Sequence, residues 1–242
     1  MADAVDYGEI ADDYAFFLAH STETEAQRAA LAPHMARLGS EGRLLDFGAG
    51  DGAFTAGLVA EHGAPACIAF VEPSPVQAAK ARARLAALAE TRELDGLAGA
   101  GPFDLILANH SLYYVADPPR TVAALADALA PSGRLIAALL DRENALARIW
   151  RGAYAAAGRD FPFWLADDIA PLLARHGAVA SEWVDYRLAF EDSPAARATI
   201  MRFLTGGTLG EAEAEALALF DRHRAGSRIV IDTRYPHLVL TR

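Results

Sequence analysis

The fold of this chain is decided by the stretch Leu44-Leu45-Asp46-Phe47-Gly48-Ala49-Gly50-Asp51-Gly52. A short apolar run, residues 43–47, leads into glycines at alternate positions, and residues 54–61 then return to helical spacing. Glycine lets the backbone turn sharply at the end of a strand and lets a ligand approach the N-terminus of the next helix. The stretch therefore predicts a strand, a loop that binds a nucleotide-like ligand, and a helix.

Outward from this loop, apolar runs alternate with helical patterns. Strands are predicted at residues 67–71, 103–108 and 134–140, and helices at 75–88 and 119–130, whereas the third strand cannot be placed within residues 86–101. Such alternation indicates a parallel sheet covered by helices. Residues 1–40 read as a helical cap, with a break near Ser21, and residues 228–233 and 236–241 as a closing antiparallel hairpin. We predict one domain over residues 1–242, with a core of 41–242.

Composition excludes several classes of function. The chain has 22 basic and 32 acidic side chains, a net charge of -10, which disfavours nucleic acid as a partner. Cys67 is the only cysteine, so a disulfide framework or a cysteine-built zinc site within the chain is excluded, and we predict no metal. No secretory signal or membrane span is predicted, since the apolar run 135–140 is too short. We expect a soluble cytoplasmic protein, monomeric or homodimeric, with a small-molecule substrate.

Two features favour a sulfonium nucleoside over NAD as the ligand of the loop. Asp46 lies two positions before the first glycine, and a helical leader precedes the strand. With an acid, one apolar residue and then glycines at alternate positions from Asp46 to Gly52, residues 43–140 resemble class I methyltransferases. The resemblance implies an α/β fold with a doubly wound, mostly parallel seven-stranded Rossmann-like sheet and an N-terminal helical cap, and S-adenosyl-L-methionine as cofactor.

Glu72 ends the second strand at about the distance from the glycine loop at which an acid reaches a ribose. A carboxylate accepts hydrogen bonds from both ribose hydroxyls, and the resemblance assigns Glu72 that role. The alternative is that Glu72 is a solvated acid at the end of a strand and binds no ligand. With Ser74 as a weaker candidate, we expect the cofactor site to comprise Asp46, Gly48, Ala49, Gly50, Glu72, Pro73, Gln77 and Asn109.

The segment Phe103-Asp104-Leu105-Ile106-Leu107-Ala108-Asn109 resembles the fourth-strand motif of these enzymes, after which residues near the transferred methyl group follow. His110 is a candidate general base, because imidazole titrates near neutrality, and equally a packing residue. Tyr14 and Asn109 complete the candidate catalytic set. Aromatic faces suit the cationic sulfonium, and the candidates for such a lining, each also explicable as core, are Tyr7, Tyr14, Tyr113, Tyr114 and Trp164.

The leader Tyr14-Ala15-Phe16-Phe17-Leu18-Ala19-His20-Ser21-Thr22-Glu23 resembles the N-terminal segment of histamine N-methyltransferase and its bacterial relatives. The resemblance implies that the leader covers the cofactor pocket and that Glu23 holds a cationic or hydrogen-bond-donating substrate; otherwise Glu23 only caps a helix. We expect a substrate pocket drawn from Glu23, residues 109–114 and residues 161–164, including Tyr113, Tyr114 and Trp164. Small amines or amino-acid-derived metabolites are the expected acceptors.

Three alternatives to methyl transfer stay open at this point. A methyltransferase-like fold can turn the amine of S-adenosylmethionine onto its own carbon chain, which yields azetidine-2-carboxylate. An NAD-linked oxidoreductase is compatible with the glycine loop, because Gly48, Gly50 and Ala53 also satisfy the dinucleotide fingerprint. A cofactor-binding module without catalysis is the third.

Overall fold

The computed structural model describes residues 10–210 and 212–242, which divide into two compact units. Within the described residues, unit 1 comprises the chain up to Gln27, Leu140–Phe163 and Val184–Tyr235. Unit 2 comprises Arg28–Leu139, Trp164–Trp183 and Pro236–Arg242. Whether the two units fold as one domain is a separate question, and the single domain over residues 1–242 stays a prediction.

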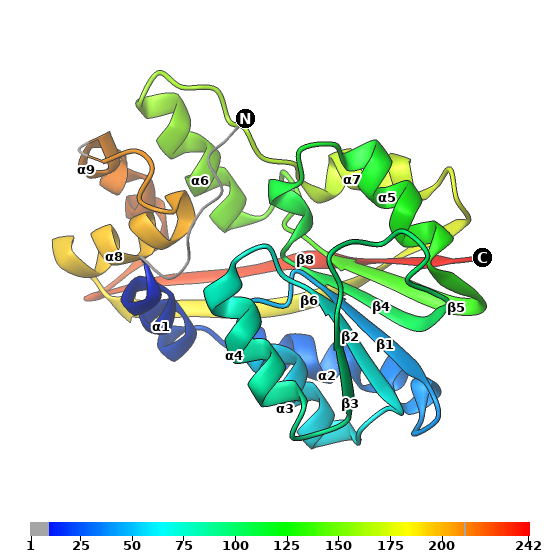
Figure 1. Ribbon diagram of the computed structural model, residues 1–242. Coiled ribbons are helices and arrows are strands. Elements are labelled where there is room, and N and C mark those ends of the chain that lie inside the picture. The colour runs from blue at the N-terminus through cyan, green and yellow to red at the C-terminus, as the bar shows by residue number, and fades with distance from the viewer. Residues whose placement is uncertain (1–9, 211) are drawn as a thin grey trace. The chain divides into compact units, whose positions relative to one another are not determined.

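Unit 2 is built on a parallel sheet with helices on both faces (Figure 1). Its strands are β1 (Arg43–Phe47), β2 (Cys67–Val71), β3 (Glu90–Glu93), β4 (Phe103–Asn109) and β5 (Leu129–Ala138). Its helices are α2 (Glu23–Leu38, whose first turn belongs to unit 1), α3 (Ala53–His62), α4 (Pro75–Leu85), the 3₁₀ turn η1 (Leu112–Tyr114), α5 (Pro118–Asp127) and α7 (Ala166–Leu173). The parallel strands follow the order β3-β2-β1-β4-β5, so the winding direction reverses between β1 and β4. This confirms the predicted doubly wound α/β fold, and ligands of such sheets bind beyond the carboxyl ends of the strands at the point of reversal.

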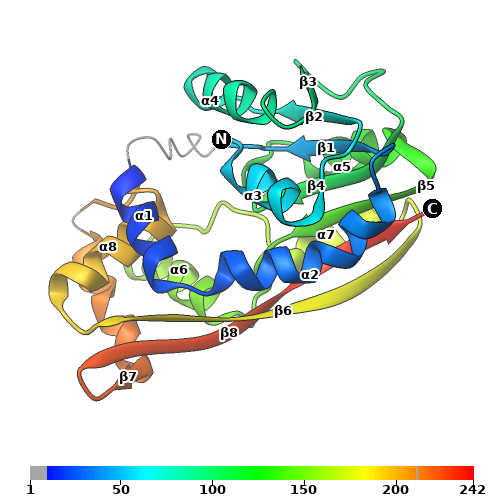
Figure 2. The same ribbon diagram turned by 90° about the horizontal axis from the view of Figure 1, so that it is seen from below.

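The core of unit 2 explains why these segments are strands and helices. One cluster of buried side chains joins α2, α3 and α4 to the sheet, and includes Met35, Leu58, Phe70, Leu85 and Leu107. Figure 2 shows α3 and the C-terminal part of α2 over the same face of the sheet. On the other face, α5 packs against α7 and β5. Because both faces are covered, the central strands carry continuous apolar runs, such as Cys67–Val71 in β2, rather than alternating patterns.

The end of the chain differs from the expected hairpin. Residues 228–241 form one strand, β8 (Arg228–Thr241), whose last five residues pair antiparallel with β5. The hairpin prediction was wrong because Thr233-Arg234-Tyr235 contains no turn-forming residue, and Pro236, which lacks an N–H, precedes the paired residues 237–241. The hairpin lies earlier instead, where β7 (Arg224–Ala225) pairs with β8 around Gly226, whose φ is 64°.

The sheet therefore has eight strands rather than seven, in the order β3-β2-β1-β4-β5-β8-β6 with β7 beside β8. The strand β6 (Ala178–Glu191) and β8 each contribute residues to both units. The third strand, missing from the prediction, is β3 at Glu90–Glu93.

Unit 1 contains helices that pack on one another around the outer halves of β6 and β8. They are α1 (Ala11–His20), α6 (Ala145–Ala156), α8 (Pro194–Thr205), α9 (Ala212–Glu215) and the 3₁₀ helix η2 (Ala216–His223). The predicted break in the leader is confirmed, since α1 ends at His20 and the Ser21 hydroxyl accepts a hydrogen bond from the Glu23 N–H at 3.1 Å. Across the described residues, none of the helices combines the length and apolarity needed to cross a membrane.

Candidate functional site

The glycine loop lies at the carboxyl end of β1, where the winding of the sheet reverses. Gly48, Gly50 and Gly52 have φ values of 82°, 56° and 75°, a region that side chains with a Cβ rarely adopt. A Cβ on Gly48 would lie 2.3 Å from the Cβ of Ser111, whereas a Cβ on Gly50 would meet nothing within 4 Å. The loop is thus in contact with Ser111 at Gly48, whereas no protein atom occupies the side-chain position of Gly50.

Glu72 lies beside this loop at the end of β2. Its Oε2 accepts a hydrogen bond from the Gly50 N–H at 2.8 Å, and its Oε1 accepts one from the Ser74 N–H at 2.9 Å. Carboxylate oxygens have further lone pairs, so both remain able to accept from the hydroxyls of a ribose. Pro73 follows Glu72, and Gln77 lies in the first turn of α4, which the Ser74 hydroxyl caps.

Asp46 lies within β1, buried beneath the loop. It accepts a hydrogen bond of 2.6 Å from the hydroxyl of Thr55 in α3. Burial raises the pKa of Asp46 to about 6, the Thr55 hydrogen bond opposes this rise, and the nearby charge of Glu72 adds to it. Asp46 thereby ties the strand to the helix on either side of the loop.

The segment after β4 supplies the neighbouring wall of the site. Asn109 ends β4, and the Ser111 hydroxyl donates a hydrogen bond of 2.6 Å to the carbonyl of Phe47, which joins this segment to β1. His110 has a φ of 51°, the only positive value among the non-glycine residues that the structure describes. Because strained backbone concentrates at functional sites, this φ supports a role for His110 beyond packing.

The ring of His110 is held by Tyr113. The Nδ1 of His110 and the hydroxyl of Tyr113 form a hydrogen bond of 3.1 Å, and the two rings stack at 16°. Burial lowers the pKa of His110 to about 4, so its imidazole is neutral at physiological pH. A neutral imidazole offers one acceptor and one donor, so His110 can orient a polar group or accept a proton as a weak base.

Three of the predicted aromatic residues come together here. Tyr113 and Tyr114 make an edge contact at 5.7 Å, and the indole N–H of Trp164 donates a hydrogen bond of 3.0 Å to the carbonyl of Val115. The backbone N–H of Trp164 also donates to the carbonyl of Tyr113 at 3.3 Å. Trp164 is 38% exposed, so its ring is available to a ligand.

Sequence reasoning missed His237, which is fully buried on β8. It pairs in register with Ala138 of β5, whose carbonyl accepts the His110 N–H at 3.0 Å. Burial lowers the pKa of His237 to about 4, and the neighbouring His110 lowers it further. The only signal in the sequence was a polar residue inside the apolar run 237–240, and the expected hairpin gave it no role.

The remaining predicted residues belong to unit 1. Tyr14 is exposed on α1 and stacks on Phe203 at 5.6 Å. Glu23 begins α2, and burial raises the pKa of its carboxyl to about 8. The charge of Glu23 also helps to raise the pKa of Tyr186, after the larger effect of burial, so the two groups lie near each other. The amide of Asn144 donates a hydrogen bond of 3.3 Å to the Tyr186 hydroxyl there.

Phe161 packs on Trp150 and Phe163 within unit 1. The structure thus brings the cofactor candidates together with residues 109–114 and Trp164 in unit 2, whereas Tyr14, Glu23 and Phe161 are described in unit 1. That these segments share one pocket stays a prediction. Tyr7 lies outside the described residues.

Comparison with known proteins decides the family. A model described as a methyltransferase domain matches residues 18–181, about two thirds of the chain. This chain belongs to that methyltransferase family. Its match takes in the glycine loop, Glu72 and the segment after β4, and it favours methyl transfer over the NAD-linked alternative. A search of curated proteins finds no match.

Solved structures of the same fold are similar over nearly the whole chain. YcgJ from Bacillus subtilis has a TM-score of 0.61 at 15% identity, with 88% of this chain and 98% of that chain covered. A geranyl diphosphate methyltransferase in complex with S-adenosylmethionine has a TM-score of 0.57 at 18% identity, with 100% of this chain and 93% of that chain covered. The [4+2]-cyclase SpnF has a TM-score of 0.53 at 20% identity, with 87% of this chain and 80% of that chain covered. The methyltransferase class I fold is therefore established.

The cofactor of this class is S-adenosyl-L-methionine, and the residues present fit it. The open face at Gly50 admits a ligand against the backbone, and the Glu72 carboxylate beside it offers acceptors to a ribose. The aromatic group of Tyr113, Tyr114 and Trp164 supplies ring faces in the same unit. The protein is an S-adenosylmethionine-dependent methyltransferase.

Proposed function

We propose that this protein methylates a nitrogen, or less favourably an oxygen, of a small amine or amino-acid-derived molecule, and that Glu23 holds the acceptor. The observation that carries the proposal is the burial of the Glu23 carboxyl, which raises its pKa to about 8. A nearby cation favours the ionised form of a carboxyl group. An ammonium group bound at Glu23 would therefore stabilise the ionised carboxylate, and the proton of the Glu23 carboxyl would leave to solvent.

The raised pKa also suits the chemistry of an amine. An ammonium ion must lose a proton before its lone pair can attack, and a base is most effective when its pKa lies near the working pH. Glu23 meets that condition better than an exposed glutamate, whose pKa is about 4.3. Bound S-adenosylmethionine supplies the electrophilic methyl group on a cationic sulfur.

The residues of unit 2 support this reading through positioning. Glu72 and the glycine loop hold the cofactor, and neutral His110, fixed by Tyr113, orients polar groups without adding positive charge beside a sulfonium. The rings of Tyr113, Tyr114 and Trp164 attract a cation by their π faces and exclude water. Methyl transfer needs such orientation more than it needs a strong acid. We also propose that the catalytic residues are the three predicted from the sequence: His110, Asn109 and Tyr14.

The test compares Glu23→Gln with Glu25→Gln, an exposed glutamate in the same helical turn. With small amines as acceptors, Glu23→Gln should lower kcat/KM at least tenfold and leave cofactor affinity unchanged, whereas Glu25→Gln should match the wild type. The kcat/KM of the wild type should rise with pH up to about 8, because the free Glu23 carboxyl ionises there, and this rise should be absent in Glu23→Gln. Normal turnover by Glu23→Gln would reduce Glu23 to a helix cap.

A further inference from the structure

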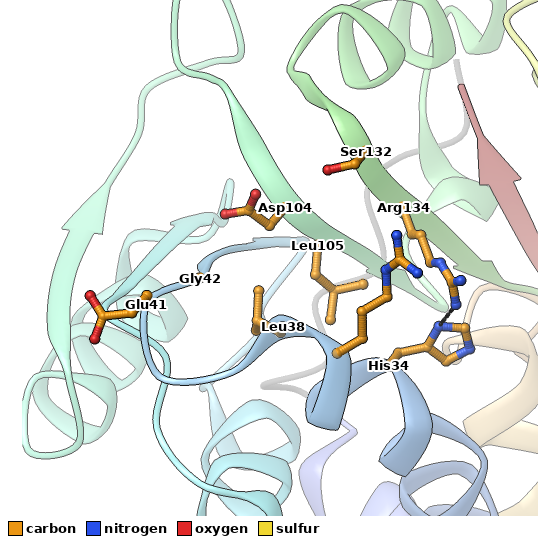
Figure 3. A pocket seen from close by; sticks show the side chains of 9 residues that line it. His34, Leu38, Glu41, Gly42, Asp104, Leu105, Ser132 and Arg134 are labelled. Atoms are coloured by element: carbon orange, nitrogen blue, oxygen red, sulfur yellow. Dashed lines mark hydrogen bonds between the residues drawn. The ribbon is translucent and has the colours of Figure 1, made fainter.

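A pocket of about 240 Å³ lies in unit 2 at the edge of the sheet away from the glycine loop (Figure 3). It is lined by α2, by Gly42 just before β1, by Asp104 at the start of β4, and by β5. The glycine loop follows the other end of β1, and five residues of strand span about 16 Å. The pocket is therefore separate from the cofactor site.

Arg134 and His34 form one side of this pocket. An Nη1 hydrogen of Arg134 points to Nδ1 of His34 at 3.2 Å, and Nε2 of His34 lies 2.8 Å from Oε2 of Glu182. Arginine cannot accept a hydrogen bond, so Nδ1 is the acceptor and Nε2–H donates to Glu182. Arg134 therefore faces an imidazole nitrogen rather than a carboxylate.

The guanidinium of Arg134 has capacity left for a ligand. Among residues 10–210 and 212–242 Arg134 forms no ion pair, and its side chain donates a hydrogen bond to His34 alone. Arg37, one turn after His34 on α2 and exposed, makes no ion pair with any described residue. The arginine fork matches the oxygens of a carboxylate or phosphate.

The acidic residues of the pocket lie on its other side. Figure 3 shows Glu41 and Asp104 across from Arg134 and His34. Asp104 is already engaged, because its Oδ2 accepts the Arg43 N–H at 2.9 Å. Ser132, which lies on β5, also lines the pocket, and its hydroxyl adds a neutral donor. The positive side is therefore open to an anion that does not need to contact either carboxylate.

We propose that this pocket binds a small oxoanion, a phosphate or carboxylate group, between Arg134 and Arg37, with Ser132 as a further donor. The site lies outside the cofactor site and does not depend on which acceptor the enzyme methylates. An anion there neutralises two guanidinium groups that have no carboxylate partner among the described residues.

The experiment is titration calorimetry of the full chain with inorganic phosphate and, separately, with acetate, in a buffer of low ionic strength. Saturable binding of one equivalent is expected for at least one probe. The variants Arg37→Gln and Arg134→Gln should weaken it at least tenfold. The matched control is Arg92→Gln, an exposed arginine on β3 that makes no ion pair with described residues, and it should bind like the wild type.

Binding of phosphate alone identifies a phosphoryl ligand, and binding of acetate alone identifies a carboxylate. The affinity for S-adenosylmethionine, measured on each variant, reports whether unit 2 is intact. Should Arg134→Gln fail to fold, exposed Arg37→Gln decides the question. The proposal is overturned by the absence of saturable binding to either probe, by equal weakening in Arg92→Gln, or by wild-type affinity in Arg37→Gln.

Discussion

The backbone N–H of Gly50 donates a hydrogen bond of 2.8 Å to Oε2 of Glu72. This bond joins the loop after β1 to the end of β2, and it places a carboxylate beside the one glycine of the loop whose missing side chain leaves open space within 4 Å. We propose that these two residues give the cofactor close backbone approach and ribose recognition.

Replacing Glu72 by Ala should weaken S-adenosylmethionine binding by roughly 1 to 3 kcal/mol, the cost of a polar partner left without its acceptor. Titration calorimetry measures this change. Glu90→Ala, which removes an exposed glutamate on β3 of the same sheet, is the control and should bind normally. Unchanged affinity in Glu72→Ala would remove this residue from the site.

Gly50→Ala should abolish most cofactor binding and leave the protein folded. A Cβ there meets no protein atom within 4 Å but occupies the face at which we place the ligand. Gly99→Ala is a close control, because Gly99 has a φ of 68° and equally open surroundings, so both variants carry similar backbone strain. Thermal unfolding should shift alike in the two variants, and only Gly50→Ala should lose affinity. Equal affinities would place the ligand elsewhere.

Acid should destabilise the protein through His110 and His237. Both have pKa values lowered to about 4, so between pH 6.5 and pH 4 the unfolded chain binds more protons than the folded one, and stability falls as pH falls. Between pH 7 and pH 5 each histidine lowers the free energy of unfolding by about 2 kcal/mol.

Removing one of these histidines tests that account. In His237→Gln the loss of unfolding free energy between pH 7 and pH 5, measured with denaturant, should be about 2 kcal/mol smaller than in the wild type. His176→Gln, in the turn after α7, should lose as much as the wild type. The same loss in all three proteins would mean that His237 titrates normally.

The glycine loop and the strands around it were predictable because their signals are local. Gly48, Gly50 and Gly52 are required by backbone angles at their own positions, and β1, β2 and β4 are largely apolar because both of their faces are covered. Nothing beyond the nearest residues is needed to recognise them.

The missed elements depend on partners distant in the chain. β3 consists of Glu90-Thr91-Arg92-Glu93 at the edge of the sheet, and only pairing with β2 makes it a strand. β8 is continuous because β5 pairs with its end, and His237 reaches the vicinity of His110 through that same pairing. Likewise, the pocket of His34 and Arg134 joins α2 to β5, about 100 residues later.

The most direct test of the account is mass spectrometry of the products formed from S-adenosylmethionine, with and without a panel of small amines and matched carboxylic acids. Methyl transfer predicts S-adenosylhomocysteine together with a methylated amine, formed only when an amine is present. Methylthioadenosine formed without any second substrate would instead indicate cyclisation of the cofactor to azetidine-2-carboxylate, and would contradict the proposed transfer to an amine.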